Sequence, residues 1–304
     1  MDEFSVQVDR EDVKPLIGGF EEKLPQIDIR NAEFYLYKIP PKQDIEEAHQ
    51  KRLLALSSLR SKEILRLESF LKRQNALPVV KIKTSRASYI VKPTHSHVWD
   101  KVFDKSQKNI RFERYVSELA DQLGIGPKFY DAYYFNPRML LMVEECISKD
   151  SGWNAMYRYA GKLDLEVFPK ILGEIIGKLH KSNHWKTYDN HELEGYLWYH
   201  ERVFLHLFCN SKTGLLRLID FGNAELISPE RFKEDKLPIS KLSWDVENTA
   251  RDLVDYAFPF KRGIKHKNAD EYKEVFNKFC EAYHKETGIY VKPGDLMWRI
   301  RSRA

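Results

Sequence analysis

A change of residue pattern near Ile147 constrains the fold of this chain more than any other feature of its sequence. Before it, short runs of apolar and β-branched residues alternate with turn residues, which is typical of strands, and one amphipathic helix is expected at 111–123, ended by Gly124. The strands are expected at 79–83, 89–92, 130–134 and 139–147. After it, apolar residues recur at helical spacing, with one further hairpin expected from 203–209 and 215–219. The sequence therefore predicts an α+β fold, with a small antiparallel-sheet lobe followed by a larger, mainly helical lobe.

Three segments follow from this pattern. Residues 79–147 are expected to form the small lobe, and residues 148–304 the larger one. Residues 1–78 are expected to be an N-terminal extension, in which 34–37 has the pattern of a strand. Within it, a long amphipathic helix is expected at 44–75, with leucines on one face that could cover the small lobe or bind a partner.

Composition excludes several classes of protein. With 304 residues, of which 42% are hydrophobic, the chain can bury a core that needs no disulfide or metal to fold. Its three cysteines include no CxxC pair, which argues against a disulfide framework or a zinc site. No apolar run approaches the roughly 18 residues of a membrane span, and the first residues lack the pattern of a secretory signal. We therefore expect no membrane span and a location in the cytoplasm or nucleus.

The charge of the chain gives only a weak indication of its partners. A net charge of +5 is mild for 304 residues. Basic residues gather at 261–267 and again at 299–303, close to the C-terminus. Binding of nucleic acid by this basic C-terminal face is one hypothesis, although a solvated charged surface explains the same pattern.

The most specific motif is an apolar strand that ends in Asp220-Phe221-Gly222. It resembles the metal-binding motif of the protein-kinase-like superfamily, in which the aspartate holds Mg²⁺ that bridges the phosphates of ATP. Further segments resemble those of choline-kinase-like and aminoglycoside-phosphotransferase-like proteins, in the same order, between residues 79 and 256. The resemblance implies a two-lobed protein-kinase-like fold with ATP and Mg²⁺ as its cofactors.

The resemblance also implies which lysine contacts the phosphates. Glu113 matches the glutamate, near the start of a helix, that pairs with a strand lysine. That lysine is either Lys92 or Lys101. Lys92 ends an apolar strand 21 residues before Glu113, whereas Lys101 lies 12 residues before it, which is a tight connection from a strand to a helix. We therefore favour Lys92.

Two further parts of the family pattern can be located. Glu144 and Cys146 fall at the hinge whose backbone receives the adenine. His180 falls at the end of the helix that precedes the catalytic loop, and Ser243-Trp244-Asp245-Val246 with Arg251-Asp252-Leu253 resembles the helix whose aspartate anchors this loop from beneath. The resemblance implies that these residues surround the nucleotide and support the catalytic loop.

Two loops depart from the family pattern. The loop that covers the phosphates is normally rich in glycine, but the turn expected at 84–88 contains none. The catalytic loop normally has His-Arg-Asp and, five residues after the aspartate, an asparagine. Here Tyr199-His200-Glu201 stands in place of His-Arg-Asp, and His206 stands in place of the metal-binding asparagine. Glutamate is longer than aspartate by one methylene, and histidine is a poor ligand for Mg²⁺.

Other registers of the catalytic loop stay open. A shift by one residue gives Arg202 and Leu207, which again supply no aspartate and no asparagine. Alternatively, Asp189 lies nine residues after His180, at a typical distance for the catalytic aspartate, with Glu194 in place of the asparagine. This register needs an inserted loop before the hairpin, and a turn is the simpler interpretation of Asp189.

Three hypotheses about function follow. The loss of the catalytic Asp and Asn beside an intact Asp-Phe-Gly favours a pseudokinase that binds ATP and Mg²⁺ and acts through a protein partner. The first alternative is an active atypical kinase that transfers the γ-phosphate of ATP to a protein or small-molecule hydroxyl, with Glu201 or Asp189 as the base. The second alternative is the nucleic-acid-binding module described above.

Overall fold

The computed structural model describes residues 5–37, 79–95, 106–136, 139–148, 151–156, 166–187, 190, 192–199, 203–222, 224–230, 244–250, 252–253, 269–292 and 294. Within these residues the chain is α+β, as the sequence predicts. It divides into two compact units: unit 1 comprises Met1–Glu118 and Pro127–Ser151, and unit 2 comprises Leu119–Gly126 and Gly152–Ala304. A sheet-containing first unit and a second unit with long packed helices are consistent with the expected two-lobed, kinase-like fold.

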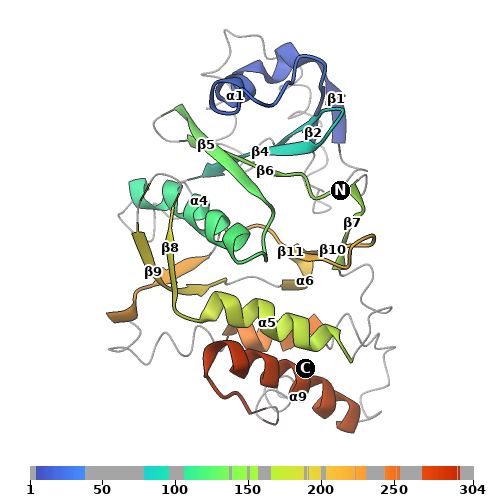
Figure 1. Ribbon diagram of the computed structural model, residues 1–304, viewed down its shortest axis with the longest axis vertical. Coiled ribbons are helices and arrows are strands. Elements are labelled where there is room, and N and C mark those ends of the chain that lie inside the picture. Colours follow the sequence, from blue (N-terminus) through green and yellow to red (C-terminus); the bar gives the residue numbers. More distant parts are fainter. Residues whose placement is uncertain are drawn as a thin grey trace, which may run out of the picture. The chain divides into compact units, whose positions relative to one another are not determined.

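Unit 1 is built on an antiparallel sheet of six strands (Figure 1). In spatial order the strands are β1 (Ser5–Val8), β2 (Glu33–Tyr37), β3 (Val79–Lys83), β4 (Ser88–His95), β6 (Met139–Glu145) and β5 (Phe129–Asn136). The four strands predicted between 79 and 147 correspond to β3, β4, β5 and β6, and the strand predicted at 34–37 corresponds to β2. Because β-branched and aromatic residues alternate along them, one face of the sheet is continuously apolar.

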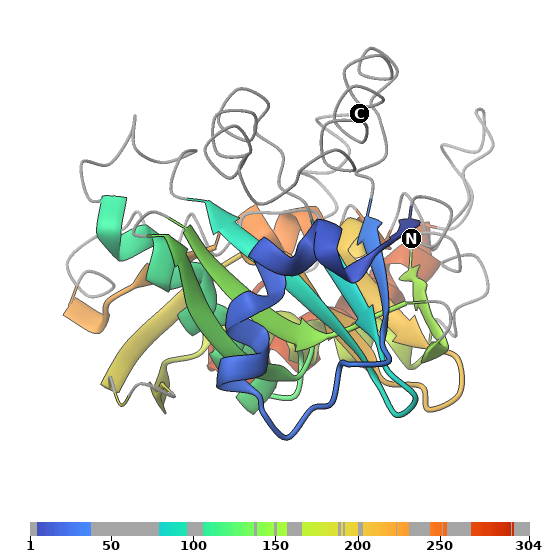
Figure 2. The ribbon, with the colours of Figure 1, turned by 90° about the horizontal axis from the view of Figure 1, so that it is seen from above.

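Helix α1 (Arg10–Lys23) lies across this apolar face, as Figure 2 shows. One face of the helix, formed by Val13, Leu16, Ile17 and Phe20, is buried in the same cluster as residues of β3, β4 and β6. The Tyr133 hydroxyl donates to the Leu16 carbonyl at 2.7 Å, which ties β5 to the helix. The sequence predicts no helix here, because adjacent glycines such as Gly18-Gly19 are typical of a turn.

The sheet continues across the boundary that the sequence analysis placed at residue 78. Strand β2 pairs with β3 from Glu33 opposite Lys83 to Tyr37 opposite Val79. The first 37 residues therefore contribute two strands and a helix to unit 1, because the apolar face of the sheet needs a cover and α1 supplies it. The amphipathic helix predicted at 44–75 lies outside the described residues.

Helix α4 (Ser106–Gln122) corresponds to the helix predicted at 111–123 and begins a turn earlier. It ends as the sequence predicts, with Gly124 in the left-handed region at φ 68°. The amides of Ile125 and Gly126 both donate to the carbonyl of Ala120, at 2.9 and 2.8 Å. These bonds satisfy a carbonyl of the last turn and fix the direction in which the chain leaves the helix.

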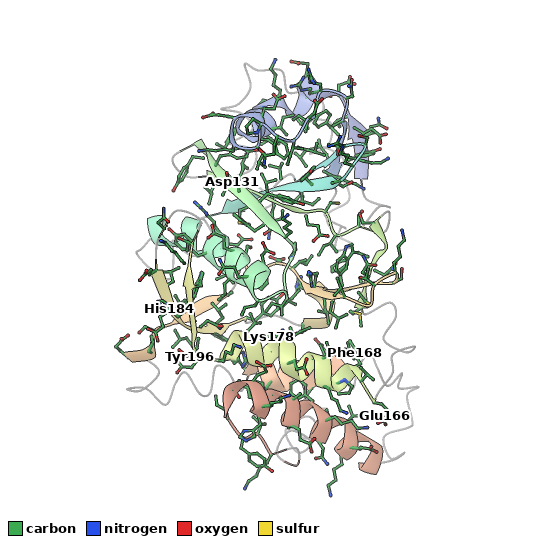
Figure 3. All side chains as sticks on the ribbon, in the orientation of Figure 1. Asp131, Glu166, Phe168, Lys178, His184 and Tyr196 are labelled. Carbon is green, nitrogen blue, oxygen red and sulfur yellow. The ribbon has the colours of Figure 1, made fainter. Side chains whose placement is uncertain are left out.

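Unit 2 contains two long helices packed side by side, α5 (Phe168–His180) and α9 (Ala269–Thr287) (Figure 1). Gly173 allows their backbones to approach closely, because a Cβ at this position would meet the carbonyl oxygen of Phe279. Glu166 and Phe168, labelled in Figure 3, lie at the start of α5, and Lys278 Nζ of α9 donates to Glu166 Oε2 at 2.5 Å. Among the described residues, no helix has the length and apolar character needed to span a membrane.

Two small antiparallel sheets also lie among the described residues of unit 2. One has the order β11 (Leu216–Leu218), β10 (Leu207–Asn210) and β7 (Trp153–Ala155). The other has the order β12 (Glu225–Ile227), β9 (Glu192–Trp198) and β8 (Asn183–Lys186). The hairpin predicted from 203–209 and 215–219 is present, but its first strand is shorter, because Val203–His206 forms the short helix α6. The β8–β9 hairpin was not predicted, because its charged residues hide the alternation with buried Trp185 and Leu197.

Candidate functional site

Lys92 and Glu113 form an ion pair within unit 1. Val91 belongs to the core cluster on the α1 side of the sheet, so the alternation of β4 places Lys92 on the opposite side. There, Lys92 Nζ donates to Oε1 of Glu113, on α4, at 2.5 Å. The two side chains are only 24% and 12% exposed. The carboxylate holds the ammonium group in one direction, which a lysine that contacts phosphate requires. Lys101, the rival candidate, lies outside the described residues.

The hinge residues lie at the end of β6. Glu144 is half-buried and stands opposite Ile90 of β4. The Cys146 amide donates to the carbonyl of Ser88 at 3.0 Å, and its side chain is buried. This amide is therefore used within unit 1 and is not available to a nucleobase.

Ser148, two residues further on, was not singled out by the sequence. Its side chain is 1% exposed, and its hydroxyl has no hydrogen-bond partner among the described residues. A buried hydroxyl without a partner costs about 1–3 kcal/mol, so each one calls for an explanation. A polar ligand atom at the hinge would provide the missing partner. The sequence does not distinguish Ser148 from other serines, because only its burial in the folded chain sets it apart.

The turn between β3 and β4 is closed by its own hydrogen bonds. Thr84 Oγ1 accepts from the amides of Arg86 and Ala87 at 3.2 and 3.0 Å, and its hydroxyl donates to the Ala87 carbonyl at 2.8 Å. These two amides are therefore already used. The segment predicted at 84–88 is a hairpin turn organised by a threonine, and it offers no cradle of free amides to a phosphate.

Asp220 has a strained backbone in unit 2. It follows β11 closely and has φ 65°, a left-handed conformation that costs a residue with a Cβ about 1–2 kcal/mol. Such residues persist where the surrounding structure fixes them, and they occur most often at functional sites. Its side chain is 50% exposed, so the carboxylate can reach a ligand.

His206 is held beside Asp220 by strand pairing. Leu207 lies opposite Leu218, and the Ile219 amide donates to the His206 carbonyl at 2.9 Å, which extends the ladder by one residue. Nδ1 of His206 is 3.7 Å from Oδ2 of Asp220, which is too long for a hydrogen bond. The two side chains that the sequence assigns to a metal ion are therefore neighbours.

A divalent cation that arrives with a nucleotide fits this pair only in part. Mg²⁺ is usually held by one or two carboxylates together with phosphate oxygens and water, and Asp220 suits that role. His206 offers an imidazole nitrogen, which suits transition metals better than Mg²⁺. Among the described residues, no group of three or more His, Cys, Asp or Glu side chains could hold a metal ion. The rest of the shell of such an ion would have to come from phosphates and water.

A buried hydrogen-bond network fixes the end of β9. Asp245 is fully buried, and its Oδ2 accepts from the Tyr199 amide at 2.6 Å and lies 3.0 Å from Nε2 of His180. The other ring nitrogen of His180, Nδ1, is 3.0 Å from the hydroxyl of Tyr283. Burial, followed by the negative charge of Asp245, raises the pKa of Tyr283. Nε2 of His180 is the donor to Oδ2 of Asp245, because a carboxylate has no proton to donate.

Tyr199 links this network to the Asp-Phe-Gly segment. Its hydroxyl donates to the carbonyl of Ile219 at 2.6 Å, and its ring contacts Phe221 edge to face, with centroids 5.7 Å apart. The residue two positions before Glu201 is thereby fixed to the residue just before Asp220. The sequence indicates Tyr199 only by its position, in place of the histidine of His-Arg-Asp.

Both candidate bases, Glu201 and Asp189, lie outside the described residues, as do the basic segments 261–267 and 299–303. Asn190, which follows Asp189, is described: its amide donates to the Thr187 carbonyl at 2.9 Å, and it has φ 65°. Glu194, expected to accompany Asp189, is exposed on β9 opposite His184 of β8.

No protein-family model matches this chain, and no curated protein matches it. Among the solved structures that match is the Cydia pomonella granulovirus kinase PK-1. The two chains share 16% sequence identity. The matched region covers 71% of this chain and 83% of the viral chain, with a TM-score of 0.41. At this TM-score the likeness carries no argument about fold or activity.

Proposed function

We propose that this chain is a kinase-fold protein that binds ATP with a divalent cation and acts through a protein partner rather than by phosphate transfer. The ion pair between Lys92 and Glu113 carries the proposal. In protein kinases a strand lysine held by a helix glutamate positions the phosphates of ATP. Ion pairs contribute little to stability when they are exposed. This pair joins residues 21 positions apart and is largely buried, which we attribute to a function of the lysine.

Asp220 supports the part of the proposal that concerns the cation. Its carboxylate is half exposed, and its left-handed backbone is the kind of strain found at functional sites. Asp220 would supply a carboxylate ligand to a divalent cation, which would neutralise phosphate charge. The Lys92 ammonium group, directed by Glu113, would attract the phosphates.

The residues at the two catalytic positions support a lack of phosphate transfer. With the apolar strand aligned, the resemblance puts Glu201 in place of the catalytic aspartate of a kinase and His206 in place of its metal-binding asparagine. A base displaced by one methylene loses the alignment on which proton transfer depends. A protein that binds nucleotide without turning it over would use the bound state to present a surface to a partner.

Thermal unfolding of the full chain tests nucleotide binding. ATP at 100 times its dissociation constant adds about 2.7 kcal/mol to the stability of the native state, so the unfolding midpoint should rise clearly. The rise should be lost in Lys92→Met. It should persist in Lys83→Met, a control that removes an exposed ion pair with Glu33 from the neighbouring strand. No rise in the wild type, or an equal rise in Lys92→Met, would contradict the proposal.

One observation favours a second function, an active atypical kinase. Asp245 and Ile219 hold Tyr199 at its amide and its hydroxyl, which fixes the chain two residues before Glu201. The resemblance gives Asp245 the role of anchoring the catalytic loop, and this contact suits that role. Such support favours Glu201 over Asp189 as the base, if the chain transfers phosphate.

Phosphate transfer from ATP labelled at the γ-position separates the two functions. The chain should be incubated with protein acceptors and with small alcohols, and its own phosphorylation should be followed in parallel. The pseudokinase proposal expects no transfer above the background of Asp220→Asn. Transfer that is lost in both Glu201→Gln and Asp220→Asn, with ATP binding retained in the former, would establish the active kinase instead.

A further inference from the structure

The position of His206 is fixed by the backbone and by a neighbouring ring. Its carbonyl accepts from the Ile219 amide, one residue before Asp220. Its ring lies edge to face against Tyr199, with centroids 6.4 Å apart, and Tyr199 is itself held by Asp245. The side chain is 22% exposed, so the imidazole has little freedom to turn away. An ion bound by Asp220 would therefore have the imidazole of His206 beside it.

The distance between the two side chains suits two ligands of one ion. Metal bonds of about 2.1 Å at angles between 90° and 109° place two donor atoms roughly 3.0–3.4 Å apart. Nδ1 of His206 and Oδ2 of Asp220 are 3.7 Å apart, slightly more than this. The carboxylate of Asp220 is half exposed and can close the remaining few tenths of an ångström by a small rotation.

The chemistry of this pair differs from that of the kinase pattern. An aspartate with an asparagine offers oxygen donors, which Mg²⁺ requires, whereas an aspartate with a histidine offers one oxygen and one nitrogen. Imidazole is a ligand of first-row transition ions, and the affinity of a mixed N/O site rises from Mn²⁺ through Co²⁺. Mg²⁺ gains little from a nitrogen ligand and loses an oxygen ligand.

We infer that the cation this site takes with a nucleotide is a first-row transition ion, such as Mn²⁺ or Co²⁺, in preference to Mg²⁺. The inference rests on the proposed nucleotide binding and deepens it. Asp220 and His206 each supply one ligand, and phosphate oxygens and water supply the others, because the described residues contain no larger cluster of ligands. His206 thereby acts as a selectivity residue for the metal.

Calorimetric titration of the full chain with ATP tests this preference. Dissociation constants are measured in EDTA, Mg²⁺, Mn²⁺ and Co²⁺, without reference to any catalytic activity. In the wild type, ATP should bind at least about tenfold more tightly with Mn²⁺ or Co²⁺ than with Mg²⁺. In His206→Asn, which restores an oxygen donor, this ratio should fall to within about threefold. His184→Asn is the matched control, because it changes an exposed histidine of β8, and it should keep the wild-type ratio.

A spectroscopic measurement keeps the test decisive if His206→Asn fails to fold. Electron spin echo modulation of the wild-type chain with Mn²⁺ and ATP should show a coupled imidazole nitrogen. The coupling should change when the histidines carry ¹⁵N, and it should persist in His184→Asn. Absence of a coupled nitrogen would show that His206 is not a ligand.

The outcomes separate this inference from the proposed function. If ATP binds with the same ratio in the wild type and in His206→Asn, and no coupled nitrogen is seen, the inference fails while nucleotide binding stands. If ATP binds in none of the four conditions, the proposed function fails and the inference fails with it. Tight binding in Mn²⁺ or Co²⁺ that depends on His206 supports both.

Discussion

The Lys92–Glu113 pair of unit 1 and the His206–Asp220 pair of unit 2 differ in how closely they follow the kinase pattern. Lys92 and Glu113 have the residue types of that pattern and are in contact at 2.5 Å, with little exposure. His206 and Asp220 are 3.7 Å apart, more exposed, and only Asp220 has the expected type. A group that holds phosphate needs only a directed positive charge, whereas a group that prepares phosphate for transfer needs ligands of defined hardness. Under the proposed function, the Lys92–Glu113 pair meets the first requirement and the His206–Asp220 pair changes the second.

The second pair lies next to a buried hydrogen-bond network. In unit 2, Asp245, His180, Tyr283 and Tyr199 form a complete buried network, and Tyr199 reaches Ile219. One departure from the kinase pattern, Tyr199 in place of a histidine, is itself part of this network. The network stabilises the fold whether or not the chain transfers phosphate, because unpaired buried groups are costly.

The largest predicted effect concerns this buried network. Asp245→Ala should lower the free energy of unfolding by about 3–5 kcal/mol, because it leaves the Tyr199 amide and His180 buried without their acceptor. Urea unfolding followed by tryptophan fluorescence measures it.

The matched control for this prediction is Asp220→Ala, which removes a half-exposed carboxylate from the same unit. Its effect on stability should stay below about 1 kcal/mol. Equal losses in the two variants would show that the network does not support unit 2 in the way described.

The next effect concerns the phosphate-holding pair. Lys92→Met should weaken ATP binding by about 10- to 100-fold, since it removes the positive charge that Glu113 directs. Glu113→Gln should weaken it less, because the lysine keeps its charge and loses only its orientation. Equilibrium titration with a fluorescent ATP analogue measures both. An order of effects in which Glu113→Gln is the more severe would refute the role given to Lys92.

A smaller effect is expected at the strained residue of the other pair. Asp220→Gly should raise the free energy of unfolding by about 1 kcal/mol, because glycine adopts φ 65° without penalty. The same variant should lose the part of ATP binding that depends on the cation. Asp220→Ala keeps the Cβ and should lose cation-dependent binding with no gain in stability. Denaturant unfolding and titrations with and without EDTA separate these expectations, and a less stable Asp220→Gly would contradict them.

The smallest effect separates stability from ligand binding in unit 1. Gly18 lies in α1 with open space around its Cβ position, so Gly18→Ala should stabilise the chain by about 0.5–1 kcal/mol. Its ATP affinity should equal that of the wild type. Gly19→Ala should instead destabilise, because a Cβ there meets the ring of Tyr133. If Gly18→Ala altered ATP affinity, the effect of Lys92→Met could no longer be assigned to the phosphate contact alone.

Local pattern predicted the strands β3 to β6, helix α4 and its glycine end, because each depends on spacing and turn residues within a few positions. Helix α1 and the β8–β9 hairpin escaped prediction for the opposite reason. Two adjacent glycines disfavour a helix locally, and the reason for Gly19 is Tyr133, a residue more than a hundred positions away, whose ring a Cβ would meet. The charged face of β8 and β9 likewise conceals a strand whose burial is set by distant partners.

The sequence by itself determined the α+β class, the candidate ligands Lys92, Glu113 and Asp220, and the departure at His206, since these depend on residue types and their order. The tertiary structure decided which of them meet. Glu113 reaches Lys92 because α4 returns to the side of the sheet that Lys92 faces, and His206 reaches Asp220 because two strands pair in one register. The tertiary structure also showed that the Tyr199 hydroxyl donates to Ile219 and that the Ser148 hydroxyl is buried without a partner among the described residues. Burial and contact between distant residues are properties of the folded chain, so no local pattern could have determined them.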